Sequence, residues 1–334
     1  MEEFDDVDRA LVHALQVDGR APFRRVAEVL GVSDQTVARR YARLRSTRAL
    51  RVVGFSDPTV VGDDQWHLRL RCAPDASLEI ADALARRPDT SWIGLVSGGA
   101  EIACSLRARG RAADEVLLHR LPRTPQILDV SAHEVLHVFY GGAREPFTKQ
   151  GALSEEQVAR LAEHVPADVP APRLDDVDRR LLELLRADGR APVEDLARAC
   201  GTSASTVRRR LHDLRGGGLL YLDVDVAPEV MELGLRSMLY LTVAPAHLDA
   251  AGRALAAHPE VPFAAATAGR ANISASVASA DAAGLYRYLT TRIADLPGVQ
   301  AVETAPVIHT VKAAGTHYPV RGGVTAGARP SSSS

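Results

Sequence analysis

The pattern of apolar and polar residues has a helical period at the start of the chain. Between residues 5 and 17, Val7, Leu11 and Leu15 recur on one helical face behind an acidic first turn, which suits a helix N-terminus. Gly19 follows and is the expected end of this helix. The pattern therefore predicts an amphipathic helix over residues 5–17.

Two further helices follow within thirty residues of sequence. Pro22 stands at the first-turn position of a helix over residues 23–30, which ends at Gly31, and Ser33 is placed to cap a third helix over residues 33–44. A helix, a tight turn containing glycine and a second helix that carries arginines form a helix-turn-helix arrangement.

The period then changes from helical to mixed. Residues 66–72 alternate between apolar and polar like a half-buried strand. The remaining predicted elements are a helix over 77–86, strands over 92–96 and 101–106 around Ser97-Gly98-Gly99, a helix over 112–121 and a strand over 127–138. This βαββαβ order is the ferredoxin-like pattern.

The whole pattern occurs twice. Residues 5–9, Asp-Asp-Val-Asp-Arg, recur at 175–179, and residues 18–22, Asp-Gly-Arg-Ala-Pro, recur at 188–192, both at an offset of 170. The second copy repeats the three helices, and its βαββαβ elements are predicted over 239–243, 248–257, 263–266, 273–277, 282–293 and 299–311. A period this long indicates a duplicated domain pair, because solenoid repeats run about 20 to 50 residues.

The expected fold class is α+β, with two tandem units. The predicted domains are a helix-turn-helix domain over 1–53, a ferredoxin-like sensing domain over 54–142, a linker over 143–173 with a short helix opened by a Ser154-to-Gln157 capping box, a second helix-turn-helix domain over 174–222, a second sensing domain over 223–316, and a disordered tail over 317–334.

Charge is balanced overall and concentrated locally. The 334 residues contain 40 Lys and Arg against 42 Asp and Glu, whereas residues 20–51 hold nine arginines against two acids, about +7. The equivalent residues 190–221 hold six arginines against three acids, about +3. An arginine-rich helix is often only a solvated face, but here it follows a helix, a turn and a cap, twice. The first unit is therefore expected to bind DNA more strongly than the second.

Several protein classes are disfavoured. No apolar run approaches the roughly 18 residues of a membrane span, and the acidic N-terminus differs from a signal peptide. Cys72, Cys104 and Cys200 stand far apart, which suggests neither a disulfide framework nor a structural zinc site. We expect a cytoplasmic protein without a membrane partner, and no cofactor motif is present.

These residues resemble the Lrp/AsnC (feast/famine) transcriptional regulators, whose units combine a helix-turn-helix with a βαββαβ (RAM-type) ligand-sensing domain. The resemblance is carried by residues 6–20 with 30–44 and by their counterparts in the second copy. It implies a sequence-specific regulator without catalytic activity, a double-stranded DNA operator as partner, and assembly into homo-oligomers through the sensing domains. A tandem copy then corresponds to a dimer fused into one chain.

The expected DNA-binding residues lie in the third helix of each unit, where the helix N-terminus meets base edges and arginines hold phosphates. In the first unit they are Ser33, Asp34, Gln35, Thr36, Arg39, Arg40 and Arg43; in the second they are Ser203, Ala204, Ser205, Thr206, Arg208, Arg209 and Arg210. Because the two sets differ, we hypothesise an asymmetric operator with two unlike half-sites about one helical turn apart, or a multiple of that.

The expected effector site is a strand-connecting turn that resembles the family's G-x-x-D loop. The residues are Gly98, Gly99 and Glu101 in the first copy and Gly269, Arg270 and Asn272 in the second. Glycine lets the backbone approach a ligand, and a carboxylate can hold the ammonium group of an amino acid or a related metabolite. Neither copy keeps the Asp, and the alternative is a plain hairpin turn without a ligand.

Two enzymatic alternatives remain. His133-Glu134-Val135-Leu136-His137 matches the H-E-x-x-H zinc motif, which requires a helix, yet these residues are predicted to form a strand. Siroheme decarboxylases resemble this family in fold, and His67, His119, His133, His137 and His309 are the candidate histidines for that chemistry. The chain lacks the aromatic-rich strand associated with those enzymes.

Overall fold

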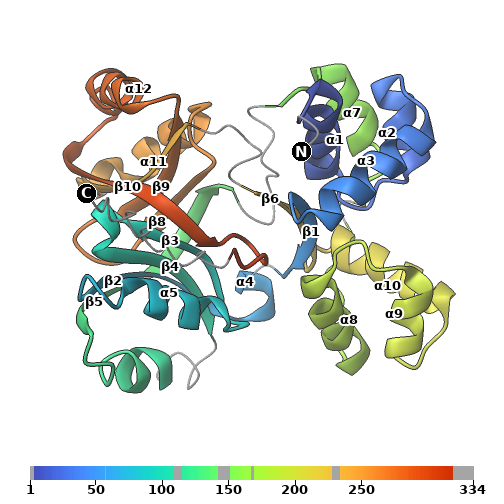
Figure 1. Cartoon of the computed structure of the whole chain (residues 1–334), viewed down its shortest axis with the longest axis horizontal. Helices are drawn as coiled ribbons and strands as arrows, with labels where there is room; N and C mark the ends of the chain where they lie inside the picture. The colour runs from blue at the N-terminus through green and yellow to red at the C-terminus, as the bar shows by residue number, and fades with distance from the viewer. Residues whose placement is uncertain are drawn as a thin grey trace, which may run out of the picture.

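The computed structural model describes residues 4–56, 58–108, 115–141, 151–166, 169–227 and 234–318. Two helical units lie beside each other on one side of a strand barrel (Figure 1). The predicted α+β class with two helix-turn-helix units is confirmed.

The first helix-turn-helix unit contains the three predicted helices. They are α1 (Asp6–Val17), α2 (Phe23–Leu30) and α3 (Asp34–Ser46). Asp5 caps α1 in a capping box with Asp8, and Ser33 caps α3 by accepting a hydrogen bond from the backbone N–H of Thr36. Gly31, with φ +69°, takes the left-handed conformation that ends α2.

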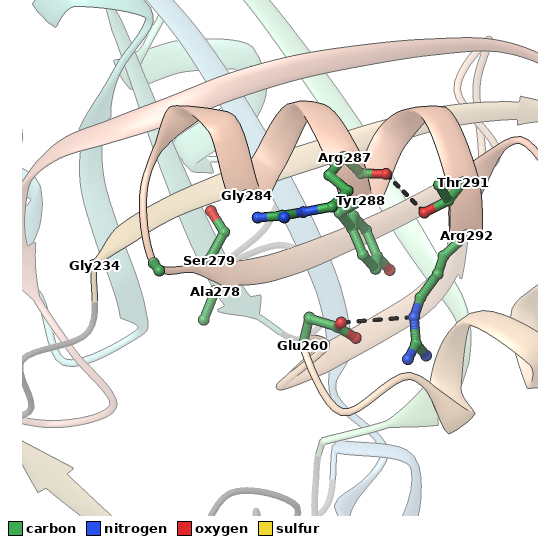
Figure 2. A pocket seen from close by; sticks show the side chains of 10 residues that line it. Gly234, Glu260, Ala278, Ser279, Gly284, Arg287, Tyr288, Thr291 and Arg292 are labelled. Atoms are coloured by element: carbon green, nitrogen blue, oxygen red, sulfur yellow. Dashed lines mark hydrogen bonds and ion pairs between the residues drawn. The ribbon is translucent and has the colours of Figure 1, made fainter.

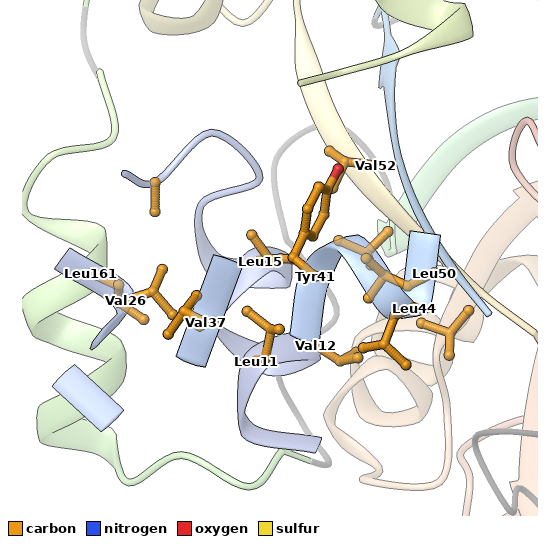
Figure 3. Close-up of a cluster of buried hydrophobic side chains, with 14 of the residues drawn as sticks. Leu11, Val12, Leu15, Val26, Val37, Tyr41, Leu44, Leu50, Val52 and Leu161 are labelled. Atoms are coloured by element: carbon orange, nitrogen blue, oxygen red, sulfur yellow. The ribbon is translucent and has the colours of Figure 1, made fainter. Parts of the chain in front are cut away.

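A fourth helix completes this unit. Helix α7 (Glu155–Ala162) opens with the predicted capping box. It lies in the segment predicted as a linker, yet Leu161 is fully buried among the side chains of α1, α2 and α3, as Figure 3 shows. The Gln157 side-chain amide also donates to the carbonyl of Val29 at 2.9 Å. Burying a leucine side chain contributes about 2 kcal/mol, so α7 is part of the first unit's core.

The second helix-turn-helix unit repeats the first. Its helices are α8 (Asp176–Ala187), α9 (Val193–Ala199) and α10 (Ala204–Gly216). Asp175 and Asp178 form the same capping box, and Ser203 caps α10 through the backbone N–H of Thr206.

A two-stranded ribbon joins the units. Strand β1 (Leu50–Phe55) pairs antiparallel with β6 (Tyr221–Val226), and Val53 lies opposite Asp223, its own equivalent at the offset of 170. A pseudo-twofold axis therefore passes through this pair. The sequence did not predict either strand, and the expected domain boundaries fall inside them. Each short strand is paired only by the other copy, so the pattern of one copy gives no sign of it.

The glycines of the repeated Asp-Gly-Arg loops pack against this ribbon. A Cβ atom on Gly19 would lie 2.8 Å from the Leu222 Cβ, and one on Gly189 would lie 3.0 Å from Val52. Helix α1 ends at Val17, its C-cap residue Asp18 is extended, and Gly19 has no positive φ. The expectation that Gly19 ends the helix is therefore wrong in its reason: the loop needs glycine for close approach.

The two βαββαβ sets form one closed barrel rather than two separate sheets. The strand order is β10-β3-β4-β2-β5-β8-β9-β7. The strands are β2 (Asp64–Cys72), β3 (Thr90–Val96), β4 (Glu101–Ala108), β5 (Ile127–Tyr140), β7 (Leu235–Val243), β8 (Phe263–Thr267), β9 (Ile273–Ser279) and β10 (Val299–Lys312). The copies meet where β5 pairs with β8 and where β10 pairs with β3.

The remaining helical segments connect or cover these strands. They are α4 (Pro58–Val61), α5 (Ser77–Ala85), η1 (Ser97–Gly99), η2 (Glu115–Arg120), η3 (Pro245–His247), α11 (Leu248–Ala257), α12 (Ala282–Tyr288) and η4 (Leu289–Ile293). The start of the predicted 112–121 helix and most of the predicted tail lie outside the described residues. Among the described residues, the helices lack the length and apolar character of a membrane span.

Candidate DNA interface and effector site

The N-termini of α3 and α10 are open to solvent. Ser33, Asp34 and Gln35 are exposed and Thr36 is half-buried; their counterparts Ser203 and Ser205 are exposed, whereas Ala204 and Thr206 are half-buried. In each helix the capping serine accepts the N–H of the threonine three residues later at 3.1 Å. Both helix starts therefore present short polar side chains beside unpaired backbone donors, which suits contacts with bases or phosphates.

Two of the arginines expected to contact DNA are tied to the first unit's own core. The Arg40 guanidinium donates to Asp5 at 2.8 Å and to Asp8 at 3.0 Å, and Arg43 also donates to Asp8. The Asp8 side chain is fully buried. These arginines neutralise a buried carboxylate and hold α3 against α1, so they are not free for phosphates as the sequence suggested.

The three arginines of the second unit that were expected to contact DNA each lie against a carboxylate. Arg210 donates to Asp178 at 2.7 Å in the place that Arg40 takes in the first unit. Arg208 pairs with Glu194 at 2.9 Å, and Arg209 lies 3.9 Å from Asp213. This surface is accordingly less positive than that of the first unit.

Arg39 differs from its equivalent Arg209. Arg39 is exposed, and within the described part of the chain no ion pair involves it. It stands one turn beyond the exposed start of α3. Of the predicted arginines, Arg39 is the one whose charge is available for a phosphate group.

The two units are fastened by a reciprocal pair of arginines. Arg20 donates to the carbonyl oxygens of Gly189 at 2.7 Å and Ala191 at 2.9 Å. Arg190 donates to those of Gly19 at 2.7 Å and Ala21 at 3.0 Å. Each arginine thus grips the loop that carries the other.

Ion pairs reinforce this fastening. Arg45 pairs with Asp188 at 2.5 Å, and Arg215 pairs with Asp18 at 2.6 Å. Arg51 donates to the carbonyl of Ala187. Part of the positive charge counted in residues 20–51 therefore joins the units. Sequence reasoning missed this role, although the exact repetition of Asp-Gly-Arg was the available signal.

The first predicted effector turn lies where the two βαββαβ sets, which we call the sensing sets, meet. Glu101, at the start of β4, accepts hydrogen bonds from Arg69 at 3.0 Å and from the Ser97 hydroxyl at 2.9 Å. Arg69 also donates to Glu303 on β10 of the second copy at 2.9 Å and lies 4.2 Å from the Tyr240 ring centroid. We call Ser97, Arg69, Glu101, Tyr240 and Glu303 the turn cluster. The hydrogen bonds that Arg69 donates to Glu303 and Glu101 raise its pKa.

Glycines make room at this turn. Gly98 and Gly99 have φ values of +71° and +89°, which a residue with a side chain rarely adopts. A Cβ atom on Gly99 would lie 3.3 Å from Ile308 of the second copy. The turn therefore abuts the partner set of strands, as the interface position of the predicted effector site requires.

The second turn is built differently. Asn272 is tied to the end of β7, because its amide donates to the Val243 carbonyl at 2.8 Å and its oxygen accepts the Val243 N–H at 2.9 Å. Arg270 is exposed, and Gly269, with φ +109°, lies under the His133 ring of the first copy. The side chain equivalent to Glu101 is thus occupied by backbone, so the two turns are not equivalent sites.

His133 and His137 do not form the zinc site of an H-E-x-x-H motif. His133 and His137 are on strand β5, where residues four apart are separated by about 13 Å. His133 contacts the carbonyl of Ala268 at 2.8 Å, and the buried His67 lies opposite it, 3.2 Å from the Ser274 hydroxyl. Burial and the nearby His133 lower the pKa of His67 to about 4. Among the described residues, no three metal-ligating side chains gather.

The remaining candidate histidines are dispersed. His119 is exposed on η2, His137 is exposed on β5, and His309 is half-buried on β10. His137 packs edge-on against Phe139. These three do not join His67 and His133 in one group.

A cavity of about 480 Å³ lies on the outer side of the second sensing set, against α12. Figure 2 shows Arg292 reaching Glu260, at 3.6 Å, and the Thr291 hydroxyl donating to the carbonyl of Arg287. Its only acidic lining residue is Glu260 and its cations are Arg287 and Arg292. It is remote in the fold from the turn cluster and shares no residue with it.

Comparison with known families identifies the same units. The model of the AsnC-type helix-turn-helix domain matches residues 4–45 and 174–215. The model of the Lrp/AsnC ligand-binding domain matches residues 238–316.

Curated relatives match one unit of the chain. The HTH-type transcriptional regulator FL11 of Pyrococcus horikoshii is 24% identical over 149 residues, which cover 44% of this chain and 97% of the relative. The HTH-type transcriptional regulator AldR of Mycolicibacterium smegmatis is 38% identical over 81 residues, which cover 23% of this chain and 46% of the relative.

A solved structure matches both units together. The siroheme decarboxylase NirDL has a TM-score of 0.61 at 13% identity, and the match covers 92% of this chain and 93% of that one. At this identity the likeness shows a shared fold.

Proposed function

The chain belongs to the Lrp/AsnC family of transcriptional regulators, and from this premise we propose that it binds one asymmetric operator per chain. We call α3 and α10 the reading helices, because their exposed starts are the expected contacts with bases. The observation that carries the proposal is that the β1–β6 ribbon and the Arg20 and Arg190 contacts hold these two unlike helices together. A fixed spacing between reading helices selects half-sites a fixed distance apart.

The two half-sites are expected to differ in sequence. Gln35 offers a bidentate pair to adenine and Asp34 accepts from cytosine, whereas the second unit presents Ala204 and Ser205 at the same positions. Selection of binding sites from random DNA by the full chain tests this directly. Two unlike half-sites are expected, and a perfect palindrome would refute the proposal.

Regulation of DNA binding is tested by titration against the DNA upstream of the protein's own gene at several salt concentrations. The variant is Arg39→Ala alone, because Arg40 holds the buried Asp8 and its loss would disturb the fold. The matched control is Arg160→Ala, an exposed arginine on α7. Specific binding that Arg39→Ala weakens and Arg160→Ala leaves unchanged is expected; binding equal to that of random DNA contradicts the proposal.

We place the amino-acid effector at the turn cluster. An ammonium group would meet Glu101 and a carboxylate group would meet Arg69, which already lies between two carboxylates. Binding would exchange internal ion pairs that join the two copies, and differential affinity for two arrangements is what changes operator affinity. Calorimetry with the amino acids, on the native chain and on Glu101→Gln, tests the site: binding that survives the substitution argues against it.

A second candidate function rests on the match to NirDL over both units. Siroheme carboxylates would need cations and histidines, and His67 with His133 is the histidine pair that the barrel brings together. We infer that the chain acts without catalysis, as a regulator. A tetrapyrrole absorbance change on adding siroheme, lost in His133→Ala, would favour the enzyme instead.

A further inference from the structure

A small cavity of about 220 Å³ lies between the second helix-turn-helix unit and the barrel. Its walls come from four parts of the chain: Arg186 on α8, Lys312 at the end of β10, Phe55 on β1, and the loop that follows α5. We call this cavity the junction pocket. It shares no residue with the turn cluster or with the reading helices.

Two cations of the junction pocket, Lys312 and Arg186, donate to uncharged oxygen atoms of the described residues. Lys312 is 7% exposed, and its Nζ donates to the carbonyl of Arg87 at 2.6 Å and lies 3.5 Å from the Thr90 hydroxyl. Arg186 donates to the carbonyl of Pro88 at 2.8 Å. In the described ranges neither cation belongs to an ion pair. Buried charges are normally paired, because burial without a counter-charge is costly.

The carboxylates near this pair are already engaged. Asp89 accepts two hydrogen bonds from Arg87, at 2.9 and 2.6 Å. Asp225 accepts three backbone N–H groups from residues 314–316, at 2.8, 2.8 and 2.6 Å. Of the pocket's other two arginines, Arg86 donates to Asp82 and Arg87 makes the contacts with Asp89 just given. Among the described residues, Lys312 and Arg186 are therefore the two cations of the pocket that form no ion pair.

The proton affinities agree with this excess of positive charge. Burial lowers the pKa of Lys312, and Cys104, Asp89 and Asp225 do not restore it against the effect of Arg186. Burial and then Arg107 lower the pKa of Arg186, and the opposing effects of Asp63 and Asp89 are smaller. An anion between the two cations would offset both penalties.

We propose that the junction pocket binds a small organic carboxylate, whose oxygens lie between Lys312 and Arg186. Part of the remaining wall is apolar, with Phe55, Ala85 and Ala314 6%, 4% and 2% exposed, and the rest includes Arg86, Arg87 and Thr90. A pocket lined by Lys312, Arg186 and these apolar side chains suits an acid with a short hydrocarbon part. The volume is below the range of drug-sized ligand sites, roughly 300 to 1,000 Å³, so the ligand is a small metabolite.

The side chains that form this pocket are not repeated in the other copy. The positions equivalent to Phe55, Arg186 and Lys312 are Asp225, Gln16 and Tyr140, at offsets of 170 to 172. The equivalent place in the other copy thus lacks both cations and carries the carboxylate of Asp225. One ligand per chain is expected.

An occupant would touch the second reading unit through Arg186 and the barrel through Lys312. Binding would therefore restrain α8 relative to the sensing strands. This consequence rests on the proposed DNA-binding function, whereas binding itself does not and is measured without DNA.

The test is isothermal calorimetry on the full chain with isobutyrate, with the neutral isostere isobutyramide, and with inorganic phosphate. We expect one isobutyrate per chain, bound at least about tenfold more tightly than isobutyramide. Arg186→Gln and Lys312→Met should each weaken isobutyrate at least about tenfold. Arg292→Gln, which changes the outer cavity of Figure 2, is the matched control and should change nothing.

Four results would overturn the proposal. The first is no isobutyrate binding up to about 10 mM, since such an interaction is weaker than a regulatory site requires, and the second is equal binding of isobutyramide. The third is unchanged binding in both variants, and the fourth is phosphate binding as tight as that of isobutyrate, which would mark a general anion site. Because Lys312 is buried, circular dichroism of Lys312→Met checks folding, and the partly exposed Arg186→Gln provides an independent result. Operator titration with and without isobutyrate then separates the two proposals, since binding without an effect on DNA leaves the pocket assigned.

Discussion

In the first helix-turn-helix unit, Asp8 neutralises two guanidinium groups, whereas its equivalent Asp178 meets one. The difference arises because Arg43 in α3 corresponds to Asp213 in α10. The duplicated units have therefore kept the same helices and caps but differ in which carboxylates their arginines pair with. In the first unit one arginine of α3, Arg39, forms no ion pair with the described residues. In the second unit each arginine of α10 lies against a carboxylate.

The residues that stayed identical are those that build the frame. The capping aspartates, the arginine beneath each of them and the Asp-Gly-Arg loops recur with matching distances. At the exposed start of each third helix, by contrast, Asp34 and Gln35 have diverged to Ala204 and Ser205. This division is expected if the shape of the pair is under one constraint and the DNA sequence read by each unit is under another.

The largest expected effect is on the buried aspartates. Asp8→Ala removes the buried carboxylate that Arg40 and Arg43 share, leaving Arg40 with Asp5, and should cost about 3 to 5 kcal/mol of local stability. Asp178→Ala should cost clearly less, because Asp178 contacts one arginine, Arg210, where Asp8 contacts two. Hydrogen exchange of the α1 and α8 amides measures each unit separately.

The control for this pair is Asp6→Ala, whose side chain is 96% exposed, and it should change α1 protection very little. Equal losses for the Asp8 and Asp178 variants would show that the second arginine adds nothing, and the comparison between the units would fail at its centre.

The next effect is a pH dependence confined to β6. Burial and the neighbouring Asp225 raise the pKa of Asp223 to about 6, whereas β1 carries Val53 at the equivalent position. The folded chain therefore binds this proton more tightly than the unfolded chain does. Its contribution is complete below about pH 4 and is lost as the pH rises through about 6, a change of about 3 kcal/mol at most.

Comparison of native chain and Asp223→Asn isolates this contribution. The two proteins should have similar unfolding free energies near pH 4, and the variant should be the more stable near pH 7. His67, with a pKa of about 4, gives a slope of the opposite sign in both proteins and cancels in the difference. Urea unfolding across this pH range measures it, and a constant difference would contradict the assignment.

The sequence was sufficient for the parts of the fold whose signals are local. Helices α1 to α3 and α8 to α10 follow from period, caps and the repeat, and the βαββαβ order follows from the strand pattern. Strands β1 and β6 were missed, because each is paired only by the other copy. The closed barrel was missed for the same reason: β5 with β8 and β10 with β3 are contacts between copies.

The candidate site divides in the same way. The exposed starts of α3 and α10 were found from the caps, but the partners of Arg40, Arg43 and Arg210 were not, because they depend on how three helices pack. The count of charge in a segment does not say which charges face outward. Glu101 lies where the two sets of sensing strands meet, while its pairing with Arg69 required the structure.

A smaller effect is expected from the arginines that fasten the units. Arg190 lies 4.5 Å from the Phe23 ring centroid and 5.3 Å from that of Tyr41, in addition to its two carbonyl contacts. Arg20 makes equivalent carbonyl contacts, and no comparable ring contact is recorded for it within the described residues. Arg190→Ala should therefore destabilise the β1–β6 ribbon by about 1 kcal/mol more than Arg20→Ala.

Protection of the ribbon amides against hydrogen exchange measures this difference. Arg190→Lys is the informative companion, because it keeps the charge and loses the two-pronged grip on Gly19 and Ala21. If Arg20→Ala and Arg190→Ala have the same effect, the aromatic contacts are incidental and the fastening is symmetric.

The smallest effect, and the one closest to function, compares Arg39 with Arg209. Removing a phosphate contact should weaken operator binding about tenfold or less and reduce the slope of log affinity against log salt by about 1. Arg39→Ala should show both changes. Arg209→Ala should show smaller ones, because Asp213 lies 3.9 Å from the guanidinium and already offsets part of its charge. Asp213→Ala then sharpens the comparison: it frees Arg209, so a regulator whose halves differ by charge pairing should gain affinity and salt dependence from it. If Asp213→Ala leaves both unchanged, the weaker half is weak because of its bases, Ala204 and Ser205, and not because of its phosphate contacts.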